Sequence, residues 1–342
     1  MEGVVGLTGQ GQIWNGQIWN GRSVLVTGAG GFIGSWLTQR LVDEGADVVV
    51  LLADLDARSQ FARAGLGERV TVVHGLLEGP DVVRRALGAH EVDTVFHLGA
   101  QTLVGVAHGD PLGTFEANVR GTYLLLDACR LAGVERVVVA SSDKAYGEVG
   151  DLPYSESTPL HGTQPYEVSK SCTDLLAQSY AATYGLPVAI ARCGNVYGGG
   201  DLNWSRIVPG AIRWLLEGDT PVIRSDGTFV RDYLHVDDVV DAYLALASWI
   251  DAGARGERAP TDEIGFNFSD EAPRTVLEMY DAVCEAFGAR VEPTILGEGA
   301  GEIHDQYLDS SRARDELGWK TSVDLSTGLD RALDWYRALL AR

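Results

Sequence analysis

The sequence predicts an α/β fold, a doubly wound parallel sheet followed by a smaller C-terminal lobe. Short apolar segments alternate with segments of helical spacing through residue 192. A glycine-rich turn joins the first strand to the first helix, and the alternation loosens after Gly198 into a segment rich in Pro, Gly, Asp and Arg. With 342 residues the chain is long enough for two lobes around a substantial core.

The first strand and helix enclose a glycine turn. Residues 24–26 are an apolar run typical of a buried parallel strand, and residues 32–42 carry apolar side chains at helical spacing. Between them Gly28 permits a tight turn, Gly31 lets the backbone approach a pyrophosphate, and Gly34 permits close packing of helix on strand. The N-terminus of the helix offers free N–H groups and partial positive charge to phosphates. The helical residues concerned are Phe32 and Ile33.

The second strand predicts which dinucleotide binds. It covers residues 47–52, and Asp54 follows it. A carboxylate there accepts hydrogen bonds from the ribose hydroxyls of NAD and repels a 2′-phosphate. We therefore expect NAD as the cofactor, with NADP as an alternative because Asp56 and Arg58 lie close by.

The remaining elements continue the alternation. Further strands are expected at 70–73, 92–98, 134–140 and 188–192, and helices at 81–87, 115–132, 166–184, 275–287 and 329–340. The strand over 92–98 ends in Gly99, Ala100 and Gln101, where small residues let a nicotinamide riboside approach the backbone. Asp237 and Asp238 are expected to cap a helix beginning near Val239.

The predicted organisation has three parts. Residues 1–20 form a tail with a tandem G-Q-I-W-N repeat at 11–15 and 16–20, whose last Trp packs beside the first strand. Residues 21–193 form the NAD-binding domain, with return elements near 230–268, and residues 194–342 are mainly a substrate-binding lobe. Residues 251–261 are polar and predict a surface loop.

Composition limits the partners. Lys and Arg number 27 and Asp and Glu 48, so the formal net charge is −21, which argues against nucleic-acid binding. An anionic substrate must then be met by a local basic cluster. No run approaches the ~20 apolar residues of a membrane span, and no secretory signal precedes the first strand. Four cysteines without a C-x-x-C pair predict reduced thiols in the cytoplasm. No metal site is expected.

A Tyr/Lys pair carries the predicted chemistry. Tyr166 and Lys170 are four residues apart on one helix and share a face. A phenol with a pKa near ~10 is a poor base at neutral pH, and a nearby ammonium lowers that pKa. The tyrosinate then removes a hydroxyl proton while a hydride leaves the carbon for NAD, and Ser142, at the end of a central strand, binds the same hydroxyl. The alternative is a surface Tyr/Lys pair without function.

Eight ordered motifs extend these observations. They are T-G-A-G-G-F-I-G (27–34), F-H-L-G-A-Q (96–101), N-V-R-G-T (118–122), S-S-D-K-A-Y-G (141–147), Y-E-V-S-K (166–170), R-C-G-N-V-Y-G (192–198), R-D-Y-L-H-V-D-D-V (231–239) and S-R-A-R-D-E-L-G-W (311–319). Together they resemble the extended short-chain dehydrogenase/reductases that act on nucleotide sugars, over roughly residues 20–340. The resemblance implies that Asn118, Ser141, Tyr166 and Lys170 lie at the cofactor. It also implies a homodimer formed through the helices 115–132 and 166–184.

The residues after Ser142 point to a subfamily. Asp143-Lys144 is similar to the pair found in CDP-glucose 4,6-dehydratases, which oxidise C4, eliminate water across C5–C6 and return the hydride to C6. The resemblance implies that Asp143 protonates the leaving C6 hydroxyl and that Lys144 helps to abstract the C5 proton. The alternatives are a solvated Lys144, or a pair that only shapes the loop. Other possible functions are a UDP-sugar 4-epimerase, a UDP-uronic acid decarboxylase and a cofactor-sensing protein without activity.

Basic side chains in the loosened segment are the expected readers of a nucleotide diphosphate sugar. Arg206 and Arg231 match phosphate oxygens in a bidentate way, and Asn195 is expected to bind a phosphate or sugar oxygen. The alternative for Arg231 is a buried ion pair with Asp232. One departure from the family is Leu76, which stands where an Asp usually reads adenine and predicts an exchangeable cofactor.

Overall fold

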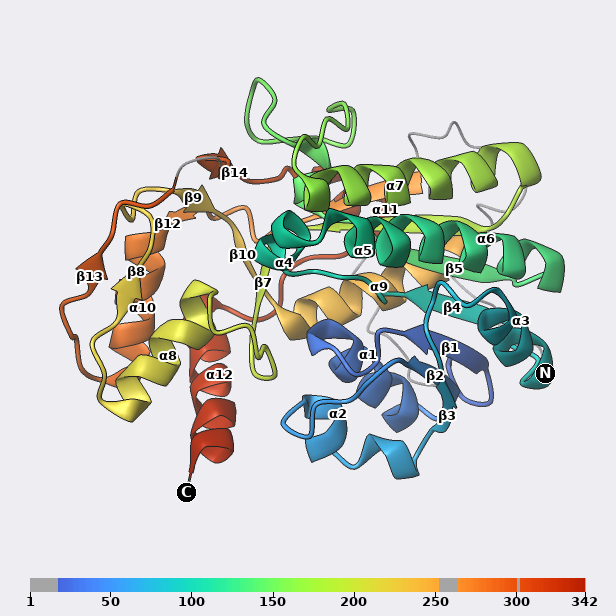
Figure 1. Cartoon of the computed structure of the whole chain (residues 1–342), viewed down its shortest axis with the longest axis horizontal. Helices are drawn as coiled ribbons and strands as arrows, with labels where there is room; N and C mark the ends of the chain where they lie inside the picture. Colours follow the sequence, from blue (N-terminus) through green and yellow to red (C-terminus); the bar gives the residue numbers. More distant parts are fainter. Residues whose placement is uncertain (1–17, 252–263, 300–301, 342) are drawn as a thin grey trace, which may run out of the picture.

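Seven parallel strands form the central sheet of the computed structural model, which describes residues 18–251, 264–299 and 302–341. Their order across the sheet is β11-β6-β5-β4-β1-β2-β3 (Figure 1). The strands are β1 (Ser23–Thr27), β2 (Asp47–Leu52), β3 (Thr71–His74), β4 (Thr94–His97), β5 (Arg136–Ala140), β6 (Val188–Cys193) and β11 (Gly265–Phe268). The predicted doubly wound parallel sheet is confirmed.

The order of strands creates a crevice. From β1 the chain proceeds outward to β2 and β3, then returns to place β4 on the other side of β1. The connections after β1 and β4 therefore leave in opposite directions. In such sheets ligands bind outside the carboxyl ends of the strands at this reversal.

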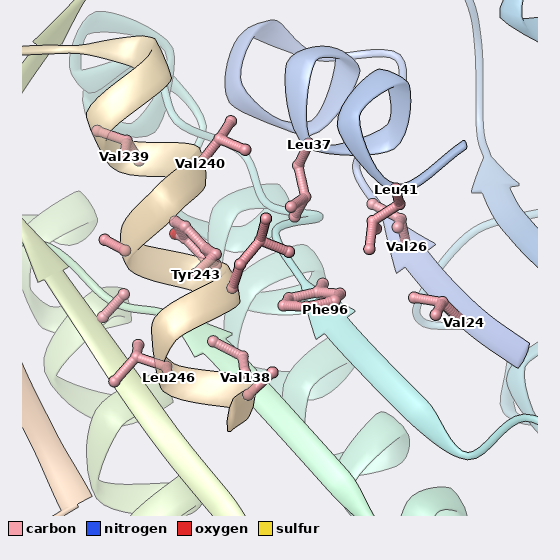
Figure 2. Packing of buried hydrophobic residues seen from close by; sticks show 14 of the residues in the cluster. Val24, Val26, Leu37, Leu41, Phe96, Val138, Val239, Val240, Tyr243 and Leu246 are labelled. Atoms are coloured by element: carbon pink, nitrogen blue, oxygen red, sulfur yellow. The ribbon is translucent and has the colours of Figure 1, made fainter. Parts of the chain in front are cut away.

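Helices cover both faces of the sheet (Figure 1). One face packs against α3 (Pro80–Ala89), α6 (Gly121–Ala132) and α7 (Pro165–Tyr184), and the other against α1 (Phe32–Asp43) and α9 (Val236–Asp251). Figure 2 shows Leu37 of α1 and Tyr243 of α9 facing Phe96 of β4 in the second of these layers. Trp19 is buried in the same cluster, with its ring 5.7 Å from that of Phe96. The predicted packing of the last tail Trp is confirmed.

A second group of helices lies beside the sheet (Figure 1). α8 (Ile207–Glu217), α10 (Val276–Phe287) and α12 (Leu325–Leu340) enclose their own buried apolar cluster. Short strands pair in small sheets apart from the central one: β7 (Asn195–Tyr197) with β10 (Tyr233–His235), β8 (Val222–Ile223) with β13 (Thr294–Ile295), and β9 (Val230–Arg231) with β12 (Arg274–Thr275) and β14 (Asp305–Gln306). α11 (Ser311–Leu317) precedes α12. The domain boundary at residues 193 and 194 stays a prediction.

Three predicted helix boundaries are wrong, one of them that of α12, which begins at Leu325 and not at Leu329. The helix expected over 115–132 is divided into α5 (Pro111–Phe115), a π-helical turn (Glu116–Arg120) and α6. α9 begins at Val236, so Asp237 and Asp238 lie in its first turn instead of preceding it. Asp238 accepts hydrogen bonds from the backbone N–H and the hydroxyl of Ser322, at 2.8 and 2.7 Å. Its carboxylate therefore fastens a distant segment, a role that local sequence does not indicate.

Other expectations concern the chain as a whole. Residues 1–17, with the first copy of the repeat, and residues 252–261 of the predicted loop lie outside the described residues. Among the described helices none combines the length and apolarity required to cross a bilayer. All four cysteines are free thiols.

Candidate active site

A cavity of about 1010 Å³ opens at the carboxyl ends of β1, β4, β5 and β6 and continues into the second lobe. It is large enough for a dinucleotide and a second ligand. All predicted site residues except Asn118 line it. They are Gly28, Gly31, Phe32, Ile33, Gly34, Asp54, Gly99, Ala100, Gln101, Ser141, Ser142, Asp143, Lys144, Tyr166, Lys170, Asn195, Arg206 and Arg231.

The glycine turn brings bare backbone to the cavity. Gly28 has a φ of +76° and a Cβ there would lie 2.7 Å from the nitrogen of Gly99. A Cβ on Gly34 would lie 2.1 Å from the carbonyl oxygen of Gly28, so only glycine lets α1 start this close to β1. The buried Ser141 hydroxyl oxygen, also in the cavity wall, has no hydrogen-bond partner among the described residues. A side-chain-free cradle at a helix N-terminus and an unsatisfied hydroxyl fit a dinucleotide.

Acidic side chains surround the end of β2. Asp54 and Asp56 line the cavity, whereas Arg58 is absent from its described lining. Arg58 is bound instead by Asp56, with Nη2 2.7 Å from Oδ2, and this hydrogen bond holds the pKa of Asp56 below its usual value. The charge distribution therefore favours NAD over NADP. Leu76, at the end of β3, also lines the cavity and is more than half exposed.

Asn118 does not line the cavity, contrary to its expected place at the cofactor. It is 1% exposed, and its amide accepts from the N–H of Gln101 at 2.7 Å and donates to the Gln101 carbonyl at 2.9 Å. The amide also donates to the hydroxyl of Ser169 on α7. Asn118 therefore holds the loop after β4 in place from within the π-helical turn, a geometry that often marks functional sites.

The pKa of Tyr166 responds to its burial and to neighbouring groups. Burial raises the pKa of Tyr166 to about 12. The positive charge that most opposes this comes from Arg206, and a hydrogen bond with Ser142 also lowers the pKa. Lys170 donates from Nζ to the carbonyl of Ala140 at 2.8 Å, and burial lowers the pKa of Lys170 to about 8. Arg206 thus lowers the pKa of Tyr166 against the effect of burial, and the expected effect of Lys170 on the phenol stays a prediction.

Arg206 is held by a residue that the sequence did not single out. Asp201 is 3% exposed, and its Oδ2 lies 2.9 Å from Nη1 of Arg206. Its backbone carbonyl accepts from the hydroxyl of Tyr336 on α12, at 2.8 Å. The second lobe thus sets the position of the cation that most lowers the pKa of Tyr166. Only the short spacing of five residues between Asp201 and Arg206 hinted at this pair.

The loop after β5 holds an acid and an amine together. The hydroxyl of Ser142 donates to Oδ1 of Asp143 at 2.8 Å, and Nζ of Lys144 lies 3.0 Å from Oδ2 of Asp143. Lys144 also donates to Gln306, from which it is separated by 162 residues. Burial lowers the pKa of Lys144 below its ordinary value, and Asp143 opposes this effect. Lys144 is therefore paired and not a solvated lysine. The ion pair with Asp143 is present, as the alternative of a pair that only shapes the loop also requires.

Arg231 binds backbone carbonyls instead of forming the ion pair with Asp232 that was the alternative for it. Its guanidinium donates to the backbone carbonyls of Val230 and His304, both at 2.7 Å, and to that of Ile303. No ion pair with Asp232 occurs among the described residues. Asp232 is 1% exposed and accepts from the N–H of Leu308 at 3.0 Å, and burial raises its pKa to about 7.

A glycine cradle facing a Ser–Tyr–Lys group across one cavity defines a dinucleotide-dependent enzyme of the short-chain dehydrogenase/reductase type. The model of the NAD dependent epimerase/dehydratase family matches residues 24–259. The chain belongs to that family, and NAD is its cofactor. The resemblance drawn from the motifs is confirmed.

Curated relatives include both branches of this family. The chain is 34% identical to dTDP-glucose 4,6-dehydratase of Streptomyces antibioticus, over 92% of each chain. It is 33% identical to UDP-glucose 4-epimerase of Mycolicibacterium smegmatis, over 92% of this chain and 98% of the relative. It is 31% identical to CDP-glucose 4,6-dehydratase of Salmonella typhimurium, over 93% of this chain and 91% of the relative. The chain spans 47% of the length of three trifunctional UDP-glucose 4,6-dehydratase relatives from Arabidopsis thaliana.

Solved structures give the same result. UDP-glucose 4-epimerase of Thermotoga maritima, solved with UDP-glucose, is 29% identical with a TM-score of 0.83, covering 93% of this chain and 99% of that one. dTDP-glucose 4,6-dehydratase of Streptomyces venezuelae, solved with NAD bound, is 30% identical with a TM-score of 0.80, covering 92% and 97%.

Proposed function

We propose that the protein is an NAD-dependent 4,6-dehydratase of a nucleoside-diphosphate glucose, with CDP-glucose as the preferred substrate. The observation that carries this proposal is the Asp143–Lys144 pair, in the same cavity as Tyr166. Oxidation and reduction at a sugar hydroxyl need one acid–base residue, which is Tyr166. Elimination of water needs a second acid and a second base. A side chain able to give a proton and one able to take a proton stand beside Tyr166.

The proposed roles follow from the proton that each group handles. Bound NAD supplies the hydride acceptor and donor. Tyr166 takes the proton of the C4 hydroxyl, which Ser142 binds. Lys144 takes the proton from C5, the C5–H electron pair forms the C5=C6 bond, and the C6–O bond breaks as Asp143 protonates the leaving oxygen to give water. The hydride removed from C4 is then delivered to C6 while Lys144, as an ammonium, returns a proton to C5. Tyr166 releases a proton to solvent and Asp143 regains one from it, which restores the starting state.

Charge and position support a diphosphate next to these groups. Arg206 and Arg231 line the cavity of a chain whose net charge is −21, and Asn195 lines the same cavity. A guanidinium in an otherwise acidic protein is a local attractor for a phosphate. We assign Arg206, Arg231 and Asn195 to the substrate. We assign to NAD the other cavity residues that the sequence predicted for the cofactor.

The test uses purified protein in D2O with a panel of CDP-, dTDP-, GDP- and UDP-glucose. The proposal expects a 4-keto-6-deoxy product with one solvent deuterium at C5, observed by mass spectrometry and NMR, and fastest turnover with CDP-glucose. A C4-inverted sugar without deuterium at C5 would reject dehydration. The same panel identifies the preferred nucleobase of the substrate, because the four nucleotide sugars are compared at equal concentration.

A UDP-sugar 4-epimerase is the second candidate. It is favoured by the R-D-Y-L-H-V-D-D-V segment at 231–239, which resembles the epimerase and decarboxylase branch, and by the similarity to epimerases of known structure. An epimerase has no need of Lys144 as a base. Lys144→Met would therefore leave epimerisation nearly intact and would abolish dehydration. A UDP-uronic acid decarboxylase and a cofactor sensor without activity remain weaker alternatives.

We also propose a cytoplasmic homodimer. Four free cysteines are consistent with a reducing compartment. α6 and α7 lie side by side on one face of the molecule (Figure 1) and expose Tyr123 and Leu175. Apolar side chains of this size on adjacent helices suit an isologous contact between two copies.

A further inference from the structure

Lysine is almost absent from this chain. Of its 27 Lys and Arg residues only three are lysine: Lys144, Lys170 and Lys320. Lys144 and Lys170 line the cavity, whereas Lys320 is exposed. An amine gives up its proton within an accessible pH range, and a guanidinium does not. Two of the three lysines thus stand where proton transfer is proposed, and arginine carries nearly all other positive charge.

The nitrogen of Lys144 has two acceptors. One is Oδ2 of Asp143, at 3.0 Å, and the other is the side-chain oxygen Oε1 of Gln306. Gln306 is fully buried, and its Nε2 donates to the backbone carbonyl of Asp143 at 2.9 Å. The amide therefore bridges Lys144 and the loop that carries Asp143. The orientation of the amide is set because its oxygen must accept from Lys144 and its nitrogen must donate to Asp143.

Gln306 comes from a strand that also holds a second site residue. It lies on β14, where it pairs with Arg231 of β9. The carbonyls of Ile303 and His304, immediately before this strand, accept the guanidinium of Arg231. A single segment thus fastens a proposed phosphate reader and a proposed proton acceptor.

We propose that Gln306 is a positioning residue for Lys144, which aims the lone pair of its amine at the substrate. A neutral amine has two N–H bonds and one lone pair in a tetrahedral arrangement. When Asp143 and Gln306 accept the two N–H bonds, the lone pair takes a remaining direction, and Lys144 lines the cavity. The inference rests on the proposed role of Lys144 as a base and names the residue that makes the base directional.

The groups around Lys144 shift its pKa, so the contact with Gln306 can be tested by measuring that pKa. Burial lowers its pKa, Asp143 and Asp232 raise it, and Arg231 lowers it. Gln306 is neutral and accepts a hydrogen bond. Removing its oxygen takes an acceptor from a buried ammonium, whereas a carboxylate in its place adds a negative charge. The two changes must shift the pKa of Lys144 in opposite directions.

The experiment compares Gln306→Met and Gln306→Glu with the wild-type protein labelled with [ε-¹³C]lysine. Three lysines give three side-chain signals, and the signal lost in Lys144→Met assigns Lys144. We expect the pKa of Lys144 to fall in Gln306→Met, which removes an acceptor, and to rise by about one unit in Gln306→Glu, which adds a negative charge. One unit is a tenfold change in proton affinity. Lys320 serves as the internal reference and stays unchanged. Unchanged Lys144 titration in both variants would overturn the proposal.

Activity provides a second readout. The pH profile of C5 deuterium incorporation should move in the same direction as the titration, and Gln306→Met should lower kcat at least tenfold with little change in KM. Gln60→Met, at another buried glutamine that lies outside the described cavity lining, is the matched control and should match wild type. If the wild-type protein performs no elimination while the titrations still shift, the proposed function fails and the contact stands. If elimination occurs and neither variant alters its pH profile, the positioning role fails.

Discussion

Tyr166 stands where its phenol is hard to ionise, because burial raises its pKa to about 12. Arg206 and Ser142 oppose that effect, and Arg206 is in turn held by Asp201. The acid–base chemistry of Tyr166 therefore depends on a residue of the second lobe as well as on its own helix. In the proposed mechanism, proton transfer at Tyr166 is thereby coupled to the segment that we propose binds the substrate.

Tyr166→Phe removes the proposed proton acceptor and keeps the ring. We expect turnover of the best nucleotide sugar to fall about 10²- to 10⁴-fold, a typical effect of losing a general base. NAD affinity should be largely kept, because the glycine turn and Asp54 remain. Steady-state kinetics and NAD titration by calorimetry measure the two effects. Normal turnover of the variant would rule out Tyr166 as the base.

Asp232 links stability to pH. Its pKa is about 7 in the folded protein, above the ordinary value near ~3.9, because the carboxyl is buried. Between these values the folded protein keeps a proton that the unfolded chain has lost. Its contribution is therefore complete below about pH 4 and disappears as the pH rises through about 7.

Asp232→Asn removes this titration. The difference in unfolding free energy between wild type and variant should fall by up to about 4 kcal/mol from pH 4 to pH 7. Urea unfolding of both proteins across that range measures it. A difference that does not vary with pH would show that folding does not raise the pKa of Asp232.

At the level of secondary structure, the junction of β1 and α1 sets the cofactor site. α1 begins so close to β1 that a methyl group on Gly34 would meet the carbonyl of Gly28. The π-helical turn before α6 has a comparable role, because it turns Asn118 toward the loop after β4. Both devices fix backbone rather than side chains at the dinucleotide.

Gly34→Ala should separate α1 from β1. We expect a loss of about 1–3 kcal/mol in stability, as for other overpacked sites, and a loss of NAD affinity of at least tenfold. Gly88→Ala in α3 is the control, since its methyl group would meet nothing within 4 Å. That change should stabilise the helix by about 0.5–1 kcal/mol. Thermal unfolding and NAD titration separate the two, and equal NAD affinity in both variants would contradict the cradle.

For the molecule as a whole, the proposed homodimer predicts a contact through α6 and α7. α6 and α7 form a broad surface on which Leu175 is 53% exposed. We expect a dimer at micromolar concentration in light scattering, and a monomer when Leu175→Glu places a charge in the contact. Lys320→Glu, at an exposed position that we do not assign to the contact, should leave the dimer intact. A monomeric wild-type protein would contradict the proposal.

Local sequence was sufficient for much of this protein. Continuous apolar runs predicted the strands and apolar side chains at helical spacing predicted the helices, because each pattern depends on neighbours within a few residues. The glycine spacing predicted the dinucleotide turn, and the spacing of four predicted that Tyr166 and Lys170 share a helix face. The site residues predicted from the motifs all line one cavity, except Asn118.

The tertiary structure alone decided the contacts between distant segments. Gln306 meets Lys144 across 162 residues, the charge of Arg206 acts on Tyr166, and Asp238 binds Ser322 instead of capping α9. None of these pairs has a periodicity or a short spacing that a sequence displays. Their physical cause is the packing of the second lobe over the sheet edge, which brings buried polar groups together and obliges each to find a partner there.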